Sequence, residues 1–247
     1  MPKFFMQVPD DAAQILVTGE DAHHIGYALR SRVGDAITVC NTDSRAATYG
    51  WDYHCHISAF DAHTVTLDVD RAEKSDTESD VTITLYQAVP KNDKFDTIVQ
   101  KAVELGVNTI VPVLTKRCIS RPDEKSQIKK RERLQKIAAE AAKQCGRSIL
   151  PEVKPFISFA EALTDCQDAD CKLICYEGGG IRLKEAYAEH QHSIALFVGS
   201  EGGFEPEEVK QAAENGMISC TLGKLILRCE TAPIAAISVL RSLTGDI

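Results

Sequence analysis

The sequence lacks any apolar run long enough to cross a membrane. A transmembrane helix needs about 20 consecutive apolar residues, and nothing in the 247 residues approaches that length. The first residues, MPKFFMQVPDDAA, also lack the basic, apolar and small-residue segments of a secretory signal. The hydrophobic content of 44% is ordinary for a globular protein. We therefore expect a soluble, cytoplasmic protein of one or two domains, without a membrane partner.

Paired cysteine motifs are also missing. The nine cysteines are an odd number without a CxxC pair, and most have apolar neighbours, as Cys175 and Cys220 do. This pattern argues against a disulfide framework or a zinc ribbon. His54-Cys55-His56 has the composition of a metal cluster, but successive strand residues point to opposite faces. We expect reduced, mainly buried thiols and no metal site.

The chain has no overall excess of positive charge. Its 28 Lys and Arg residues against 36 Asp and Glu residues give a net charge of -8, which argues weakly against nucleic acid. The charge is uneven, because residues 1–70 carry 4 basic and 10 acidic residues, whereas residues 91–147 carry 14 basic and 7 acidic residues. The middle of the chain is thus a candidate phosphate-binding surface. A solvated helix face is the alternative.

The first third of the chain is predicted to be mostly β. Residues 34–41, 51–60 and 63–70 are short β-rich runs, and one helix with Asp21 as its N-cap interrupts this part of the chain. Strands at this spacing suggest a small barrel. The stretch RAEKSDTESD, residues 71–80, is polar and has the composition of a linker.

From residue 81 onwards, strand and helix patterns alternate. The runs KLICYE and SIALFVG are continuously apolar, as is typical of strands covered on both faces. Helical faces lie between the strands, and the last helix is TAPIAAISVLRSL. This alternation predicts an α/β domain with a mainly parallel sheet. The predicted organisation is a β-barrel over residues 1–72, a linker over 73–80 and an α/β domain over 81–247.

Two glycine-containing segments follow predicted strands. The first, LFVGSEGGFEPEE (196–208), has glycines that let the backbone approach a ligand, and Glu201 is the only charge inside its loop. It has neither GxGxxG nor a P-loop lysine, which disfavours dinucleotide and P-loop sites. A structural turn and a ligand loop are equally compatible with this segment.

The second segment is TLGKLILRCETAPIAA (221–236). It runs through Gly223 to Arg228 and Glu230 at the start of an apolar helix, and Glu230 or Thr231 is the expected cap. A capped helix with an Arg–Glu surface pair is the structural alternative. Two such loops at the ends of neighbouring strands favour a ligand site together more than either does alone.

A third segment, AAKQCGRSILPEV (141–153), puts Arg147 beyond a helix end. The planar fork of its guanidinium suits a phosphate or a carboxylate, and a cation is also favoured at a helix C-terminus. Gly178–Gly180 follow another strand and either line the same pocket or form a plain loop.

Five segments spread between residues 23 and 237 resemble the RsmE family of ribosomal RNA methyltransferases, and the resemblance extends over nearly the whole chain in order. The last of them resembles that family's N-terminal RNA-binding domain. They are PKNDKFDTIVQKAVELGV (90–107), EAAKQCGRSILPEV (140–153), FVGSEGGFEPEEV (197–209), LGKLILRCETAPIAAI (222–237) and HHIGYALRSRVGDAITVCN (23–41).

The resemblance implies the SPOUT fold, in which the α/β domain is tied in a trefoil knot, together with a PUA-like N-terminal barrel. It implies a homodimer that uses S-adenosylmethionine to methylate N3 of uridine 1498 in the 16S rRNA of the assembled small subunit, and no DNA partner. The predicted helix over 231–243 is apolar on several faces, which also favours a dimer. One position departs from the family, because Ser200 stands where a proline is common.

The chemistry of methyl transfer and the residue types suggest roles for individual residues. Arg228 would stabilise negative charge on the uracil, and Glu230 would orient Arg228 or accept a proton; which of the two is the chemical residue stays open. The RNA-binding candidates are Arg30, Arg32, Lys91, Lys94, Arg117 and Arg147, and Arg45 shares the basic character of the N-terminal part. The cofactor-binding candidates are Tyr176, Glu177, Val198, Gly199, Glu201, Gly202, Gly203, Leu222, Gly223, Leu225, Leu227 and Arg228.

Two other functions fit the same motifs. One is a different SPOUT enzyme, such as a ribose 2′-O-methyltransferase, which shares the knotted loops and differs in the acceptor atom. The other is an RNA-binding module without catalysis. The methylated nucleoside distinguishes the first alternative from uridine N3 methylation, and cofactor binding tests the second.

Overall fold

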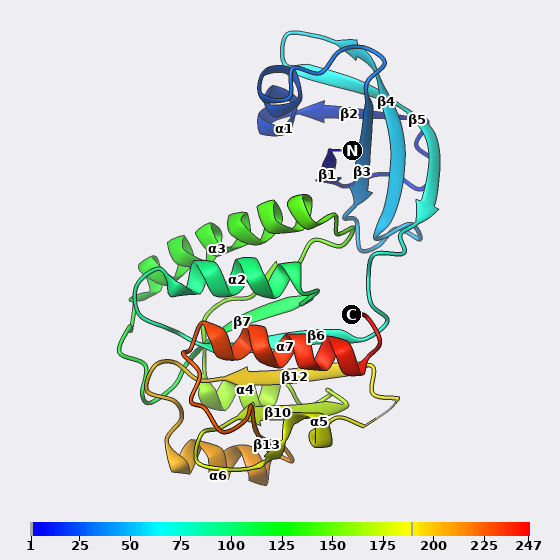
Figure 1. Ribbon diagram of the computed structural model, residues 1–247. Coiled ribbons are helices and arrows are strands. Elements are labelled where there is room, and N and C mark those ends of the chain that lie inside the picture. Colours follow the sequence, from blue (N-terminus) through cyan, green and yellow to red (C-terminus); the bar gives the residue numbers. More distant parts are fainter. Residues whose placement is uncertain (1, 189) are drawn as a thin grey trace. The chain divides into compact units, whose positions relative to one another are not determined.

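The computed structural model describes residues 2–188 and 190–247, and the chain divides into two compact units (Figure 1). The first comprises Met1–Glu78 and Ala142–Leu150, and the second comprises Ser79–Ala141 and Pro151–Ile247. The change of unit after Glu78 falls inside the predicted linker. The sequence pattern did not predict that residues 142–150 belong with the first unit.

The first unit is built on a five-stranded sheet with the order β1-β3-β4-β5-β2. β1 pairs with β3 in parallel, and the other neighbouring strands are antiparallel. The hydrophobic core of the unit includes Phe4, Ile37, Tyr53 and Leu67. The strands are β1 (Lys3–Met6), β2 (Gln14–Thr18), β3 (Ala36–Asn41), β4 (Trp51–Phe60) and β5 (Thr64–Lys74).

Two local predictions for this unit were wrong. Helix α1 (Gly19–His23) has Thr18 at its N-cap position, and it continues as the π-helix η1 (His24–Ala28). Asp21 therefore lies inside the first turn, where it forms an ion pair with Lys143. β5 extends through Lys74, so the first two residues of the predicted linker belong to a strand.

The His54-Cys55-His56 segment of β4 has a structural role. His54 hydrogen-bonds Glu73 and His56 hydrogen-bonds Asp70, each at 2.8 Å, whereas Cys55 points into the core. Both imidazoles are thus engaged by carboxylates of the neighbouring strand, and His56 also lies 3.8 Å from Asp68. The residues that the structure describes include no group of three or more possible metal ligands.

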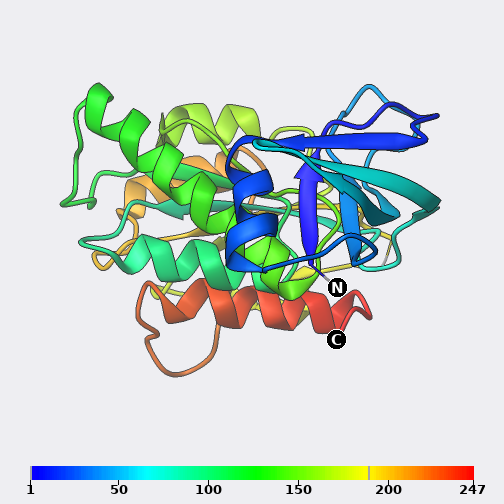
Figure 2. The ribbon, with the colours of Figure 1, turned by 90° about the horizontal axis from the view of Figure 1, so that it is seen from above.

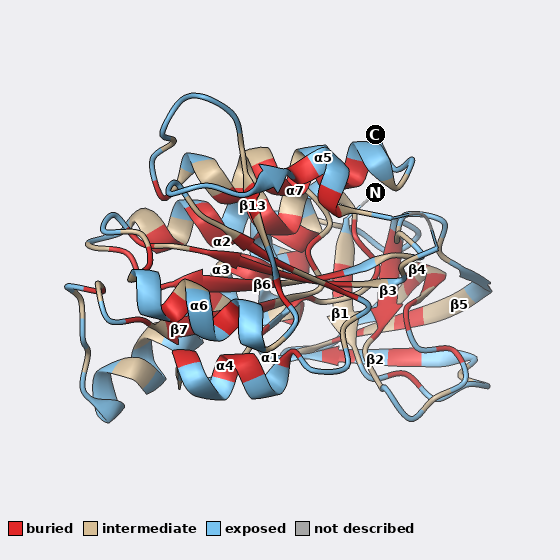
Figure 3. Ribbon diagram, turned by 90° about the horizontal axis from the view of Figure 1, so that it is seen from below, coloured by how far each residue is buried: buried red, intermediate tan, exposed pale blue. Residues whose placement is uncertain are grey.

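The second unit contains an eight-stranded parallel sheet with the order β11-β13-β10-β12-β6-β7-β8, in which β9 also pairs with β7. Its central strands are buried because helices cover both faces (Figures 2 and 3). The strands are β6 (Thr82–Ala88), β7 (Thr109–Leu114), β8 (Glu152–Val153), β9 (Ile157–Ser158), β10 (Cys171–Cys175), β11 (Ile181–Arg182), β12 (Ser193–Val198) and β13 (Ile218–Thr221).

The helices form two groups on opposite faces of this sheet (Figure 2). α4 and α6 share a core cluster with the strands, in which Phe159, Phe197 and Phe204 pack together. α7 packs against α2 and α5. The helices are α2 (Lys94–Glu104), α3 (Glu124–Cys145), α4 (Phe159–Asp165), α5 (Leu183–Ala186), α6 (Pro206–Glu214) and α7 (Thr231–Leu243).

The ends of the long helices follow local sequence signals. The apolar face of α2 is buried, and Gly106 after the helix has φ +85°, a conformation that glycine adopts readily. α3 begins at Glu124, and the carboxylate of the preceding Asp123 accepts a hydrogen bond from the Ser126 amide at 2.8 Å, as an N-cap carboxylate does. The bounds of α7 agree with the apolar segment predicted from the sequence.

All nine cysteines are free thiols, and seven of them are buried. This confirms the prediction of reduced, mainly buried cysteines. Among the described residues, no helix combines the length and the apolar character that a membrane span requires.

Candidate active site

A pocket opens at the carboxyl ends of β10, β12 and β13, where the loops after the three strands meet. Open parallel sheets bind ligands at this edge. The two glycine segments therefore line one site, as expected. Predicted cofactor residues in the lining are Tyr176, Glu177, Val198, Gly199, Gly203, Leu222, Gly223, Leu225 and Leu227. The lining also includes residues that were not among the predicted cofactor ligands: Cys175, Ser200, Thr221, Lys224, Ile226, Cys229 and Ala232.

The loop after β12 requires glycine at two positions. A Cβ on Gly203, whose φ is +65°, would lie 2.4 Å from the Glu177 carboxylate. A Cβ on Gly199 would lie 3.0 Å from the Gly203 Cα. The turn closes with a hydrogen bond from the Gly203 amide to the Ser200 carbonyl at 3.0 Å. Glycine thus lets the loop fold back on itself and approach the segment after β10.

Lys94 connects three motif segments that are far apart in the sequence. Its ammonium lies 3.1 Å from the Glu201 carboxylate and 3.3 Å from the Glu230 carboxylate. The Lys91 amide donates to Glu201, and the Cys229 thiol donates to Glu230 at 3.2 Å. Lys94 was predicted to hold an RNA phosphate, but it is engaged by two carboxylates beside the pocket. This pairing favours a role within the site.

The same contacts set the ionisation of the two carboxylates. Burial alone would raise the pKa of Glu201, but hydrogen bonds to its carboxylate and the charge of Lys94 lower it overall. Burial likewise acts upwards on the pKa of Glu230, and hydrogen bonds, including those from Cys229 and Lys94, outweigh it. The pKa of Lys94 is raised, chiefly by its hydrogen bond with Glu201. At neutral pH the site therefore holds one cation between two anions.

Arg228 is exposed and, unlike Lys94 and its two carboxylate partners, takes no part in this network. Its carbonyl accepts hydrogen bonds from the amides of Thr231 and Ala232, which fixes the backbone at the start of α7. Within the described residues, no ion pair or side-chain hydrogen bond is formed by its guanidinium. Glu230 occupies the N-cap position, but its side chain makes no capping bond. Glu230 thus holds the predicted N-cap position without a capping bond, and the alternative of an Arg–Glu surface pair is not found among the described residues.

Arg117 stabilises the glycine loop after β12 through hydrogen bonds of its side chain. Its guanidinium donates to the Glu205 carboxylate at 2.9 Å and to the Gly202 carbonyl at 3.0 Å. It was predicted to bind RNA, whereas these bonds attach the loop to the start of α6. Of the predicted cofactor residues, Glu201, Gly202 and Arg228 lie outside the pocket lining.

Two buried polar atoms beside the pocket have no hydrogen-bond partner among the described residues. They are Ser200 Oγ and Gln87 Oε1, and the Gln87 amide nitrogen donates to the Gly199 carbonyl at 3.2 Å. An unsatisfied buried polar atom is costly, and such atoms are often explained by a missing ligand or water. Exposed apolar side chains, Leu225 and Ile226, border the same pocket. This combination of polar and apolar groups fits a ligand such as S-adenosylmethionine, which has both.

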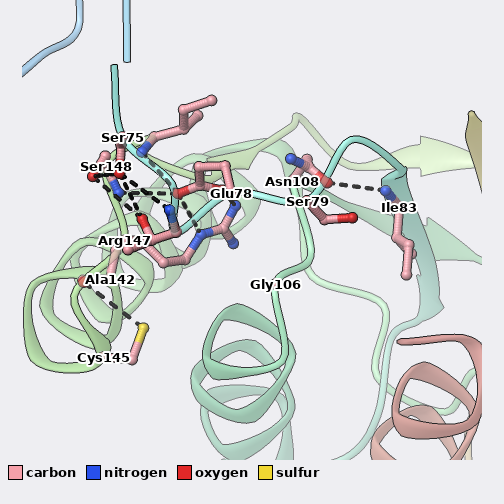
Figure 4. A network of polar contacts seen from close by, with 12 residues as sticks. Ser75, Glu78, Ser79, Ile83, Gly106, Asn108, Ala142, Cys145, Arg147 and Ser148 are labelled. Carbon is pink, nitrogen blue, oxygen red and sulfur yellow. Dashed lines mark hydrogen bonds and ion pairs between the residues drawn. The ribbon is translucent and has the colours of Figure 1, made fainter. Parts of the chain in front are cut away.

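Arg147 is a buried structural residue of the first unit, so its predicted role as a phosphate ligand was wrong (Figure 4). It is 4% exposed and lies 2.7 Å from the Glu78 carboxylate. Glu78 also accepts from the amides of Ser148 and Ile149, each at 3.0 Å. A guanidinium at this depth needs a counter-ion, and Glu78 supplies it from 69 residues earlier in the chain.

We expect Arg147→Met to lower the free energy of unfolding of the first unit by about 3–5 kcal/mol, because the Glu78 charge is left buried without its partner. The single tryptophan, Trp51, lies in β4 of this unit, so its fluorescence in urea reports the transition. Arg71→Met is the matched control, because its side chain is 65% exposed beside Glu73 and its pair contributes about 0–1 kcal/mol. Equal effects of the two substitutions would contradict the structural role of Arg147.

The predicted RNA contacts of the first unit stay predictions. Arg30 and Arg32 are exposed, and no carboxylate partner of either side chain is found within the described residues. Arg45 forms an ion pair with Asp43 at 3.0 Å.

In the second unit, the glycine run after β10, Gly178–Gly180, lies outside the pocket lining, and a Cβ on Gly180 would collide with the Ser219 backbone.

Comparisons with known proteins agree on one family. Residues 77–241 match the RNA methyltransferase domain family. The chain is 32% identical to ribosomal RNA small subunit methyltransferase E of Bacillus subtilis, over 97% of this chain and 96% of the relative. It is also 32% identical to the enzyme of the same name from Neisseria gonorrhoeae, whose crystal structure is bound to S-adenosyl methionine. The TM-score of that match is 0.86 over 98% of both chains.

A methyltransferase from Legionella pneumophila, solved with bound S-adenosylmethionine cofactor, is also similar. It is 27% identical, and the TM-score is 0.86 over 98% of this chain and 97% of that chain. The match spans both units, and the domain match includes the loops that line the pocket. The chain therefore belongs to the ribosomal RNA small subunit methyltransferase E family.

Proposed function

We propose that this protein is an S-adenosylmethionine-dependent methyltransferase that modifies N3 of uridine 1498 in the 16S rRNA of the small ribosomal subunit. Membership of the family supports methylation of small-subunit rRNA. The resemblance to RsmE carries the finer assignment to one uridine nitrogen. The pocket between the two glycine loops, with the Lys94 network beside it, is the observation on which the proposal rests.

The pocket residues suit the cofactor. Backbone groups of the loops over 199–203 and 222–227 would hold its polar parts, and Leu225 and Ile226 would cover its apolar surface. The hydroxyl of Ser200 is available as a further donor. When bound, the cofactor supplies an electrophilic methyl group on a sulfonium. The protein's contribution is to align the acceptor nitrogen with that group, which draws on proximity and orientation.

The acceptor needs a separate contribution from the protein. N3 of neutral uridine carries a proton, so it becomes a good nucleophile only as that proton leaves. We assign proton acceptance to Glu230, which stays ionised because Cys229 and Lys94 bond its carboxylate. The free guanidinium of Arg228 would stabilise the charge that develops on the uracil oxygens. Because base pairing hides N3, the uridine has to be unpaired or flipped out.

Three structural features complete the proposal. The segment after β13 lines the pocket together with the loops after β10 and β12, and it then reaches α7, which packs on α2. This path supports a trefoil knot.

The five-stranded sheet of the first unit supports a PUA-like barrel that binds RNA through Arg30 and Arg32, with Lys91 as a further contact. Val239 and Leu243 on α7 are 38% and 40% exposed, which supports burial against a second copy in a homodimer.

A transfer assay tests the proposed activity. Small subunits from a strain lacking this protein, labelled S-adenosylmethionine and the purified protein should give label in 16S rRNA, whereas subunits from the parent strain should give almost none. Calorimetry with the cofactor alone separates a methyltransferase from an RNA-binding module. Absence of both cofactor binding and label transfer would contradict the proposal.

A further inference from the structure

A stripe of lysines on α3 lies beside the loop before α2, which contains Lys91 and Asn92 and contacts the active site through Glu201. Lys125 and Lys129 are four residues apart and are followed at the same spacing by Arg133, so the three side chains share one helical face. Lys130 is adjacent to this face and lies over the Phe95 ring, 5.9 Å from its centroid. We call Lys125, Lys129 and Lys130 the α3 stripe.

Two lysines of the α3 stripe have no carboxylate partner among the described residues, whereas Lys130 lies within the electrostatic reach of Asp93 and Asp96. Arg133 forms ion pairs with both Asp93 and Asp96, which occupies the acidic side chains at the start of α2. Lys125 and Lys129 are exposed, and no ion pair or hydrogen bond of either ammonium is found within the described residues. Lys125 and Lys129 therefore place two exposed positive charges side by side in a chain whose net charge is -8.

The α3 stripe adjoins a hollow that reaches the active-site loop. The hollow is lined by Lys129, Lys130 and Arg133, and its other lining residues are Asn92, Asp93, Asp96, Ser120 and Ser126. The same loop donates the Lys91 amide to Glu201, so the hollow and the catalytic network share one chain segment. The hydroxyl and amide groups of Ser120, Ser126 and Asn92 add neutral hydrogen-bond donors to the lysine charges.

We propose that the α3 stripe and its hollow bind the phosphates of the RNA strand that flanks the target uridine. This inference rests on the proposed function, because it adds the path of the substrate to that same site. Lysine ammonium groups beside neutral donors suit phosphate oxygens without selecting a base. The contact would hold the strand while the target base enters the pocket, and base selection would stay with the active site.

The experiment compares two double variants with equal charge change. Lys125→Gln/Lys129→Gln removes the exposed part of the α3 stripe, and Lys184→Gln/Lys210→Gln removes two exposed lysines from α5 and α6. Binding of a 16S rRNA fragment containing the target is measured over a range of salt concentrations. For two lost phosphate contacts, the slope of log affinity against log salt should become shallower by about 1.4–1.8 in the first variant only.

Two further measurements separate this inference from the proposed function. Cofactor affinity of Lys125→Gln/Lys129→Gln should equal that of the unchanged protein, and its single-turnover rate at saturating RNA should stay within about twofold, as expected for a lost phosphate contact. A salt slope equal to that of the control variant would overturn the inference even if methylation is normal. Weaker binding to whole small subunits with unchanged binding to the RNA fragment would also overturn it, because the partner would then be a ribosomal protein. Absence of label transfer by the unchanged protein would instead defeat the proposed function.

Discussion

Replacing Arg228 with alanine should lower the single-turnover rate by about 10²–10³-fold, the usual cost of losing a preorganised charge-stabilising donor. The guanidinium is exposed at the pocket-lining loop and bonds no other side chain among the described residues. Its interaction with the uracil oxygens grows as negative charge develops, so its loss affects turnover more than ground-state binding. The backbone of the loop remains, and we therefore expect cofactor affinity to change little.

The structure also predicts what Arg228→Ala leaves intact. Because the Arg228 contacts at the start of α7 come from its carbonyl, the melting temperature should stay close to that of the unchanged protein. Arg182→Ala, at an exposed arginine of β11 outside the pocket lining, is the matched control and should keep normal turnover. Near-normal turnover of Arg228→Ala, or a large fall in melting temperature, would remove Arg228 from the chemistry.

Glu230→Gln should lower turnover by about 10²–10⁴-fold, the range for a positioned general base. Since the pKa of Glu230 is lowered in the folded protein, the unchanged enzyme should lose rate only as pH falls through that lowered value. Lys94→Met removes one of the contacts that lower this pKa. The acid limb of its pH–rate profile should therefore move to higher pH, and Glu230→Gln should lack that limb.

The matched control for Glu230→Gln is Glu207→Gln, an exposed carboxylate in the first turn of α6. It makes the same change of charge without touching the network and should leave both rate and pH profile unchanged. If Glu230→Gln kept the acid limb and most of its rate, proton acceptance would belong to another group, and Glu201 would be the next to test. A pH profile of Lys94→Met that does not move would show that Lys94 does not tune the base.

The repeating elements of the second unit were predictable because burial imposes a period on the sequence. β12 is continuously apolar after its first residue, Ser193, and α7 is one uninterrupted helix; both lie where the sequence indicated. β8, β9 and β11 have two residues each, too few to show any period. The glycine loops were recognisable because their position after buried strands carries a physical meaning.

The partners of charged residues were not predictable, because they depend on tertiary contacts. Arg147 has the local sequence of an exposed helix end, yet its counter-ion comes from Glu78. Lys94 lies 107 residues before Glu201, and nothing near it in the sequence indicates the pair. Arg241 is likewise buried, where it donates to the carbonyls of Val81 and Leu105. In each case the residue type shows that the side chain is a cation, but the local sequence does not show which group it binds.

Identification of the methylated nucleoside tests the central claim most directly. Small subunits from a strain lacking this protein are treated with the protein and S-adenosylmethionine, the 16S rRNA is digested to nucleosides, and the products are separated and weighed by mass spectrometry. We predict 3-methyluridine, in an amount approaching one per subunit, and none with Arg228→Ala at the same reaction time. A methyl group that the treatment newly adds to a ribose 2′ oxygen, or to any base other than uracil, would contradict the account.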